Sequence, residues 1–170
     1  MKSGKPPAST PLNKSNQSVS ATPTPVASGP PNANRTGIDL LARLGFSKVG
    51  EWSLGANKPQ VALRLLAEAK QVIYAFVREN EVLYVARTAR SLRARMRSYE
   101  QPGPSQRTNK RINGCLAASL IDGRPVHVHA MARWDGTAYR GVALNIAAGL
   151  EDPLISLLQP AWNVTESVKE

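Results

Sequence analysis

Two short apolar segments, each carrying a tyrosine, constrain the fold of this chain more than any other feature. Residues 72–77 (VIYAFV) and 82–86 (VLYVA) are rich in β-branched and aromatic residues, which favour strands. Only the four residues from Arg78 to Glu81 separate the two segments. The sequence therefore predicts one antiparallel hairpin.

The length of the connecting loop decides whether the two tyrosines lie together. A three-residue loop over 78–80, with Asn80 left-handed, sets Tyr74 opposite Tyr84. Paired residues share one face of a sheet, so both hydroxyls would then project together. A two-residue loop would shift the register and separate them. Alternatively, both rings pack in a core and keep their hydroxyls wet, as tyrosine often does.

An arginine-rich helix is predicted directly after this hairpin. Ser91 is a natural N-cap. Leu92, Met96 and Tyr99 recur at helical spacing and would form the buried stripe. Arg95 stands three residues after Leu92 and four before Tyr99, so we expect it at the margin of that stripe, beside the hairpin.

Basic residues concentrate between positions 87 and 111, and the whole chain has a formal net charge of +10. Such a charge indicates a polyanionic partner. A solvated basic helix is the alternative, but the run adjoins the hairpin, so contact with a nucleic-acid backbone is favoured. The residues expected to make this contact are Arg87, Arg90, Arg93, Arg97, Arg107, Lys110 and Arg111.

An acid and an amide, Glu151 and Asn163, stand twelve residues apart further along the chain. Residues 140–158 are expected to be helical, with a kink or break near 149–153, because Asp152 and Pro153 suit an N-cap and a first turn. Taken singly, Glu151 is an acid favoured near a helix start, and Asn163 is a turn former.

In this order the segments resemble the GIY-YIG nuclease superfamily. The matching pieces are VIY at 72–74, YVA at 84–86, the Leu92 and Arg95 spacing, and LEDPLISLLQPAWNV at 150–164. The last piece is similar to the end of the N-terminal nuclease module in the excision-repair endonuclease of that superfamily. Two motif glycines are replaced here, by Val72 and Ala86. A methyl at position 86 could crowd a substrate or shift Arg87, which keeps a catalytically inactive alternative open.

The resemblance implies an α+β fold in which a small antiparallel or mixed sheet of about three core strands is flanked by helices. It also implies a metal-dependent endonuclease that hydrolyses DNA phosphodiester bonds. Glu151 would hold one divalent cation, Mg²⁺ or Mn²⁺, and Arg95 would neutralise charge on the phosphate. The implied catalytic residues are Tyr74, Tyr84, Arg95, Tyr99, Glu151 and Asn163.

A tyrosine would act as the general base on the attacking water, as the resemblance implies. Tyr74 is the expected base and Tyr84 the orienting residue, or the reverse. An ordinary phenol has a pKa of about 10 and is a poor base at neutral pH, so we expect nearby cations to lower the pKa. Tyr99 would orient the phosphate or Arg95, and Asn163 would hydrogen-bond the phosphate, a catalytic water or a backbone near Glu151.

Three functional hypotheses follow. The chain is an active DNA endonuclease, a nucleic-acid-binding module on the same fold whose chemistry is lost through Ala86, or a basic interaction protein with an accidental motif match. Duplex or branched DNA is the expected partner, and RNA and the oligomeric state are left open. The third hypothesis predicts that Tyr74, Tyr84, Arg95 and Glu151 are scattered in the fold.

Four segments are expected along the chain. Residues 1–35 form a disordered basic tail rich in Pro, Ser and Thr, and 165–170 form a second tail. Residues 36–70 form a helix and strands that extend or cover a sheet edge. The helix would begin with a capping box of Thr36 and Asp39 and end at Gly45. Residues 71–164 form the nuclease-like domain.

The remaining polar features argue against other classes. His127 and His129 lie two residues apart on one face of a predicted strand, but a zinc site needs at least one more protein ligand. Cys115, the lone thiol, lies on the apolar side of a helix expected to begin at the N-cap Thr108. A single cysteine excludes an intrachain disulfide and fits a reducing compartment. No apolar run suits a membrane span or signal peptide, so a cytoplasmic protein is expected, nucleoid-associated when bound to DNA.

Overall fold

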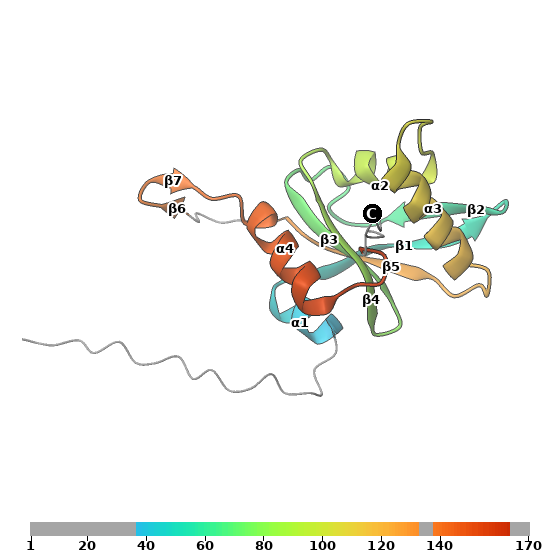
Figure 1. The fold of residues 1–170 in the computed structure, drawn as a ribbon, viewed down its shortest axis with the longest axis horizontal. Coiled ribbons are helices and arrows are strands. Elements are labelled where there is room, and N and C mark those ends of the chain that lie inside the picture. Colours follow the sequence, from blue (N-terminus) through green and yellow to red (C-terminus); the bar gives the residue numbers. More distant parts are fainter. Residues whose placement is uncertain (1–36, 133–137, 164–170) are drawn as a thin grey trace, which may run out of the picture. The chain divides into compact units, whose positions relative to one another are not determined.

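The computed structural model describes residues 37–132 and 138–163, which fall within one unit, Ala33–Glu170. Both predicted tails, Thr36 and Val164 lie outside these residues. The elements, drawn in Figure 1, are α1 (Gly37–Arg43), β1 (Ser47–Gly55), β2 (Lys58–Leu63), β3 (Val72–Arg78), β4 (Glu81–Thr88), α2 (Leu92–Glu100), α3 (Arg107–Ser119), β5 (Val126–Met131), β6 (Ala138–Tyr139), β7 (Val142–Ala143) and α4 (Ile146–Leu158).

A five-stranded antiparallel sheet in the order β2-β1-β5-β3-β4 organises the fold. The predicted α+β class is confirmed, but the sheet has five strands instead of about three. The difference arises because residues expected in the N-terminal extension supply β1 and β2, and β1 pairs along β5.

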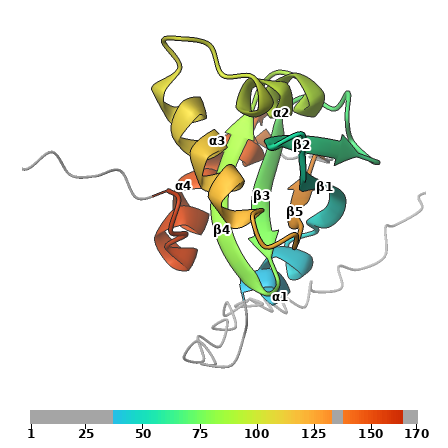
Figure 2. The same ribbon diagram turned by 90° about the vertical axis from the view of Figure 1, so that its right-hand side faces the viewer.

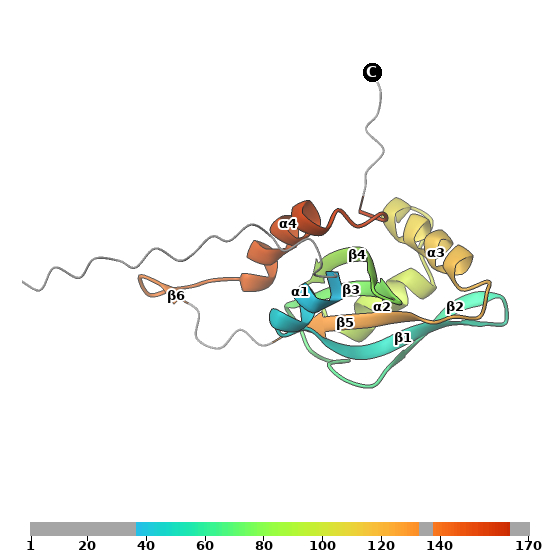
Figure 3. The same ribbon diagram turned by 90° about the horizontal axis from the view of Figure 1, so that it is seen from below.

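Helices cover both faces of this sheet. The face that carries Tyr74 and Phe76 packs with buried residues of α2 and α3, which lie next to each other in Figure 2. The opposite face, with Ile73, Ala75 and Val77, packs with α1 and α4, and Figure 3 shows α4 beside β4. Because β3 is covered on both sides, every position from 72 to 77 is buried, which accounts for its unbroken apolar run.

Side chains close the outer edges of the sheet. On β2, Glu100 Oε1 accepts the Val61 N–H at 2.8 Å, and Pro59 has no N–H to offer. On β4, the backbone of Val85 is hydrogen-bonded to the side chain of Asn163, and the Trp162 N–H donates to the carbonyl of Leu83 at 2.9 Å. Covered edges of this kind do not recruit further strands.

The β3–β4 turn differs from the prediction, yet the tyrosines still share a face. The turn has two residues between the paired Arg78 and Glu81, and Glu79, instead of Asn80, is left-handed with φ of 56°. Tyr74 therefore pairs with Ala86 and not with Tyr84. The register shifts between Phe76 and Val77, so that Phe76 pairs with Tyr84 and β4 holds one extra residue. The two-residue turn shifts the register by one residue, and this β-bulge shifts it by one more, which returns Tyr84 to the face that carries Tyr74.

Two of the predicted helix ends are correct, and a third is displaced. Gly45, with φ of 93°, ends α1 in a Schellman motif, with its N–H bonded to the Ala42 carbonyl and the Phe46 N–H to the Leu41 carbonyl, each at 3.0 Å. Ser91 Oγ accepts the Ala94 N–H at 3.2 Å and so begins α2. Helix α3 begins at Arg107 with Gln106 in the N-cap position, and not at Thr108.

The prediction of a helix over 140–158, with a kink or break near 149–153, is partly wrong. Its first residues belong to the β6–β7 hairpin, because Arg140 and Gly141 have φ of 50° and 82°, which suits a two-residue hairpin turn. Asn145 caps α4 by accepting the Ala148 N–H at 3.1 Å. The helix then runs through Pro153 to Leu158 without the expected break.

Candidate active site

Three tyrosines from three elements meet at one point beneath α2. Tyr74 comes from β3, Tyr84 from β4 and Tyr99 from α2. The hydroxyls of Tyr74 and Tyr99 are 2.9 Å apart, and the Tyr99 hydroxyl donates to that of Tyr84 at 3.3 Å. All three side chains are buried. The expectation that the two hairpin tyrosines project together therefore agrees with the structure, by way of the bulge.

Arg95 completes this group, which we call the Tyr–Arg cluster (Tyr74, Tyr84, Arg95 and Tyr99). Its Nε donates to the Tyr74 hydroxyl at 2.9 Å, and its Nη2 donates to the Tyr99 hydroxyl at 2.7 Å. Its Nη1 donates to Asn109 Oδ1 at 3.2 Å. A guanidinium has five N–H groups, so these contacts leave two of them for another acceptor.

The local sequence explains why these groups converge. Leu92 and Met96 are fully buried and anchor α2 against the sheet. Arg95 and Tyr99 are four residues apart, so they lie on neighbouring turns of the same face, with the guanidinium carbon 4.5 Å from the centre of the Tyr99 ring. The predicted position of Arg95 at the margin of the buried stripe agrees with its partly buried state.

The electrostatics of the cluster run against one expectation. Burial raises the pKa of Tyr74 to about 12, and this outweighs the opposing effect of Arg95. Burial likewise raises the pKa of Tyr99. For Arg95, burial lowers the pKa, but Tyr74 and Tyr99 more than offset that effect and raise it. Arg95 acts on the pKa of Tyr74 in the predicted direction, but the expected net lowering is wrong for Tyr74 in the free protein, because burial has the larger effect. Arg95 stays charged beside the neutral phenols of Tyr74 and Tyr99.

A cavity of about 370 Å³ lies between Arg95 and Glu151, the expected metal ligand on α4. Its walls hold one carboxylate and three guanidinium groups, with formal charges that sum to +2; the lining residues are Arg87, Thr88, Ala89, Arg90, Arg95 and Glu151. Arg87 Nε lies 2.8 Å from Glu151 Oε2. An excess of arginines around a small hollow suits a phosphate, since guanidinium groups bind phosphate oxygens well.

Glu151 is the one carboxylate among the residues that line this cavity. Within residues 37–132 and 138–163, no group of three or more His, Cys, Asp and Glu side chains could hold a metal ion. The half-buried His127 and His129 therefore make no such site in this part of the chain. A single carboxylate oxygen donor still fits Mg²⁺ or Mn²⁺, because Mg²⁺ usually keeps several water ligands.

Asn163 lies at the outer edge of β4 instead of among the phenols. Its Oδ1 accepts the Val85 N–H at 2.8 Å, and its Nδ2 donates to the Val85 carbonyl at 2.7 Å. Both ends of the amide are thus bonded to one backbone residue. We expected this amide to hydrogen-bond the phosphate, a catalytic water or a backbone near Glu151; in the free protein it bonds the backbone of Val85 and so holds β4 in place, between Tyr84 and Arg87.

Val72 and Ala86, which stand where the resembled superfamily has glycine, fit their positions. Val72 is fully buried, and Ala86, 5% exposed, packs in the core on the face that carries the tyrosines. Neither residue has a positive φ, so neither position needs the backbone freedom of glycine. In the free protein the Ala86 methyl fills core space.

The predicted nucleic-acid contacts are all exposed at the surface. They come from the end of β4, from the loop between β4 and α2, from α2 and from α3; the residues are Arg87, Arg90, Arg93, Arg97, Arg107, Lys110 and Arg111. Arg93 forms an exposed ion pair with Glu68, at 2.6 Å, and exposed pairs of this kind are weak. Each of these exposed side chains can turn toward a phosphate backbone, Arg87 and Arg93 by leaving an ion pair.

Asn109 is a buried member of the site that the sequence analysis missed. It is 7% exposed and accepts a hydrogen bond from Arg95. A signal was present, because Asn109 stands three residues before Ile112 and seven before Leu116, on the buried stripe of α3. A polar residue on an apolar stripe requires a partner, and here the partner is the guanidinium.

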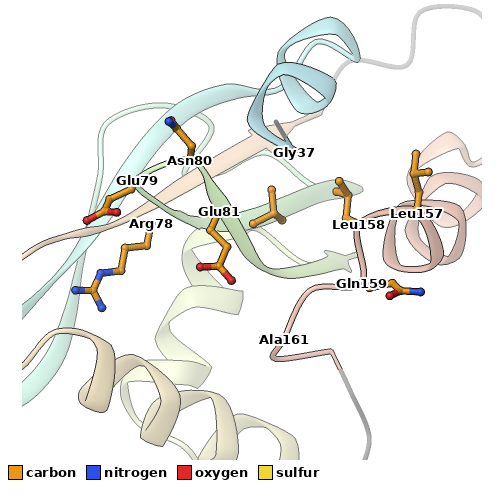
Figure 4. Close-up of a pocket in the computed structure, with 10 residues that line it drawn as sticks. Gly37, Arg78, Glu79, Asn80, Glu81, Leu157, Leu158, Gln159 and Ala161 are labelled. Atoms are coloured by element: carbon orange, nitrogen blue, oxygen red, sulfur yellow. The ribbon is translucent and has the colours of Figure 1, made fainter. Parts of the chain in front are cut away.

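A larger cavity, of about 600 Å³, lies at the β3–β4 turn. Figure 4 shows the carboxylates of Glu79 and Glu81 at the turn and Leu157 and Leu158 on α4. No residue of the Tyr–Arg cluster lines it. Its carboxylates make it unsuited to a phosphate.

Comparisons with known proteins support the fold. No family model and no curated protein matches the sequence. A solved structure of a bacteriophage T4 EndoII mutant matches with a TM-score of 0.59 and 19% identity, over 76% of this chain and 100% of that chain. The restriction endonuclease HPY188I in complex with product DNA matches with a TM-score of 0.45 and 15% identity, over 80% and 87%. The first match shows that this chain shares the fold of T4 EndoII.

Proposed function

We propose that this protein is a metal-dependent endonuclease that hydrolyses phosphodiester bonds in DNA. The observation that carries the proposal is the position of Arg95. Two tyrosine hydroxyls hold its guanidinium at the wall of a cavity that also contains Glu151. Arg95 and Glu151 line this cavity from α2 and α4, and the tyrosine hydroxyls of β3 and α2 reach it through their hydrogen bonds to Arg95, although these elements are far apart in the sequence. Convergence of this kind argues against an accidental motif match.

The phosphate would enter the cavity between Arg95 and Arg87. Arg95 would donate its two remaining N–H groups to nonbridging oxygens, and its charge would offset the negative charge that grows in the transition state. The cluster suits this task because three hydrogen bonds already fix the guanidinium, so little reorganisation is needed. Exposed arginines on α2 and α3 would bind neighbouring phosphates without reading the sequence.

Glu151 would hold the divalent cation. A bound Mg²⁺ or Mn²⁺ supplies charge stabilisation at the phosphoryl oxygens and at the leaving oxygen. In the free protein Arg87 pairs with Oε2 of Glu151, so a cation bound there would compete with Arg87 for this oxygen. Arg87 can release it by turning to an incoming phosphate, which offers the same kind of acceptor oxygens.

A tyrosine hydroxyl would accept the proton of the attacking water. The raised pKa of Tyr74 keeps that phenol neutral near pH 7, so only a small fraction of phenolate would be present. If Tyr74 is the base, the rate should rise about tenfold per pH unit above neutrality, for as long as the fold persists. In the alternative assignment Tyr84 is the base, and Tyr74 is still needed as the orienting residue.

A second candidate function, nucleic-acid binding without cutting, has two observations in its favour. Tyr74 is a poor base at neutral pH, and Arg87 occupies Glu151. Neither affects the exposed arginines that would bind a nucleic-acid backbone. In this case Arg95 would serve as a phosphate anchor alone.

Supercoiled plasmid DNA with Mg²⁺ or Mn²⁺ separates the two candidates. The endonuclease proposal expects nicking by the parent protein and none by Glu151→Ala. Binding without nicking, by the parent and by Ala86→Gly alike, would support the second candidate. A salt titration identifies the backbone contacts, because Lys110→Ala should reduce the slope of log affinity against log salt by about 1 for every DNA sequence.

A further inference from the structure

We propose that Asn109 is a positioning residue, which fixes the Arg95 guanidinium without neutralising its charge. The inference deepens the proposed endonuclease function and names a residue on α3 that none of the motif positions includes. It rests on the hydrogen bond from Arg95 Nη1 to Asn109 Oδ1, at 3.2 Å, and on the burial of Asn109.

The direction of the Asn109 amide is determined by its partners. Arginine can only donate hydrogen bonds, so the amide oxygen must face Arg95. The amide nitrogen then points away, and it donates to Gln106 Oε1 at 2.7 Å. Gln106 Oε1 also accepts the Gly103 N–H at 3.2 Å. The guanidinium is thereby tied, through two side chains, to the loop that precedes α3.

An amide suits this position better than a carboxylate would. The tyrosine hydroxyls hold Nε and Nη2, and Asn109 holds Nη1, so the three contacts together restrict rotation of the guanidinium plane. Asp at position 109 would make the same contact but would pair its charge with Arg95, and this pairing would weaken the attraction for a phosphate. Asn provides the acceptor and leaves the positive charge available.

Asn113 offers a matched control on the same helix. It lies one turn after Asn109, and its Nδ2 donates to the Tyr99 carbonyl at 2.7 Å. It therefore joins α3 to α2, as Asn109 does. Asn113 contacts a backbone carbonyl near the end of α2, whereas Asn109 contacts the side chain of Arg95. Asn113→Leu and Asn109→Leu both remove an amide of one size from α3, and only the second removes the contact with the guanidinium.

The first measurement does not depend on cutting. The Arg95 Nε–H resonance in ¹⁵N-labelled protein should be observable and slow to exchange with water in the parent and in Asn113→Leu. In Asn109→Leu it should exchange at least about tenfold faster, because the guanidinium gains freedom to leave the phenols. Equal exchange in the parent and in Asn109→Leu, with the fold intact by circular dichroism, would overturn the proposal.

The second measurement is single-turnover cleavage of plasmid DNA with Mn²⁺, beside DNA affinity measured without metal. Asn109→Leu should slow cleavage by about 10- to 100-fold with less than a twofold change in affinity, since misplacement costs rate. Asn109→Asp should lower both cleavage and affinity, and Asn113→Leu neither. Equal losses of rate in the two leucine variants would refute the assignment. If the parent does not cut, the proposed function fails, and the exchange measurement still decides the role of Asn109.

Discussion

The two halves of the candidate site are built in different ways. The Tyr–Arg cluster is buried, belongs to regular strands and a helix, and shares hydrogen bonds among all four side chains. The Arg87–Glu151 pair is held by a single ion pair, with 43% and 24% of the two side chains exposed. The first half is preorganised, and the second can exchange partners.

This difference matches what the proposed function would require of each half. A group that stabilises a transition state works best when it is fixed in advance. A group that must admit a phosphate and a metal ion has to give up its existing partner. Buried pairs resist such exchange, because removing one partner strands a charge in a poor solvent, whereas an exposed pair separates at little cost. We infer that DNA binding rearranges the second half and leaves the first unchanged.

The largest effect should follow removal of the charge from the preorganised half. Arg95→Ala should slow DNA cutting by about 10²- to 10³-fold or more, because it deletes the group that offsets charge on the phosphate. DNA affinity, measured without metal, should stay within a few-fold of the parent, since exposed arginines on α2 and α3 supply most of the attraction. Arg97→Ala, on the exposed side of the same helix, is the control. Equal losses of affinity and rate would make Arg95 a tether.

The strands and the helix of the preorganised half could be predicted from sequence, because their signals are local. The apolar run of β3 and the cap at Ser91 each act within a few residues. The bulge that places Tyr84 on the face of Tyr74 could not be predicted, since it accompanies a turn of two residues whose length the sequence leaves open. The raised pKa of Tyr74 also escaped prediction, because it results from burial by distant elements.

In the Arg87–Glu151 half of the site, the sequence identified both residues but not the contact between them. Glu151 and Arg87 were both singled out, but for a metal ion and a phosphate. Their contact arises where the end of β4 meets α4, sixty-four residues further along the chain. The same limit applies to Asn163, whose two hydrogen bonds to Val85 depend on where the chain returns to the sheet edge.

Alkaline pH should unfold the protein through its buried phenols. The pKa of Tyr74 is raised from 10 to about 12 by burial, so the folded state keeps a proton that the unfolded state loses above pH 10. The contribution of Tyr74 to the free energy of unfolding is therefore fully present below pH 10. It falls as the pH rises from 10 through 12, by up to about 3 kcal/mol for this residue. Tyr74→Phe should flatten that fall, as measured by urea unfolding between pH 9 and 12. The exposed Tyr139→Phe is the control, and a Tyr74→Phe curve parallel to that of the parent would contradict the burial argument.

Replacing Asn163 tests how far both halves of the site depend on β4, the strand that carries Tyr84 and Arg87. Val85 lies between Tyr84 and Arg87, and Asn163→Ala removes both hydrogen bonds to its backbone. We expect a loss of about 2 kcal/mol in the free energy of unfolding, from two hydrogen bonds worth about 1 kcal/mol each. Asn80→Ala, in the exposed β3–β4 turn, should cost less than half as much. Equal losses would mean that the edge of β4 is held mainly by Trp162 and its neighbours.

The smallest effect concerns the Arg87–Glu151 half of the site. It tests whether Arg87 competes with a metal ion for Glu151, or whether only the total charge of the cavity matters. Arg87→Gln should tighten Mn²⁺ binding to the free protein by about two- to fivefold, because Glu151 no longer has to leave a guanidinium, and an exposed ion pair is worth less than about 1 kcal/mol. Arg90→Gln removes the same charge from the same cavity and leaves the Arg87–Glu151 contact in place, so it should tighten binding less. The affinities can be followed by electron paramagnetic resonance of free Mn²⁺. If both variants tighten binding equally, the cavity responds only to its total charge, and Arg87 does not compete with the metal ion for Glu151.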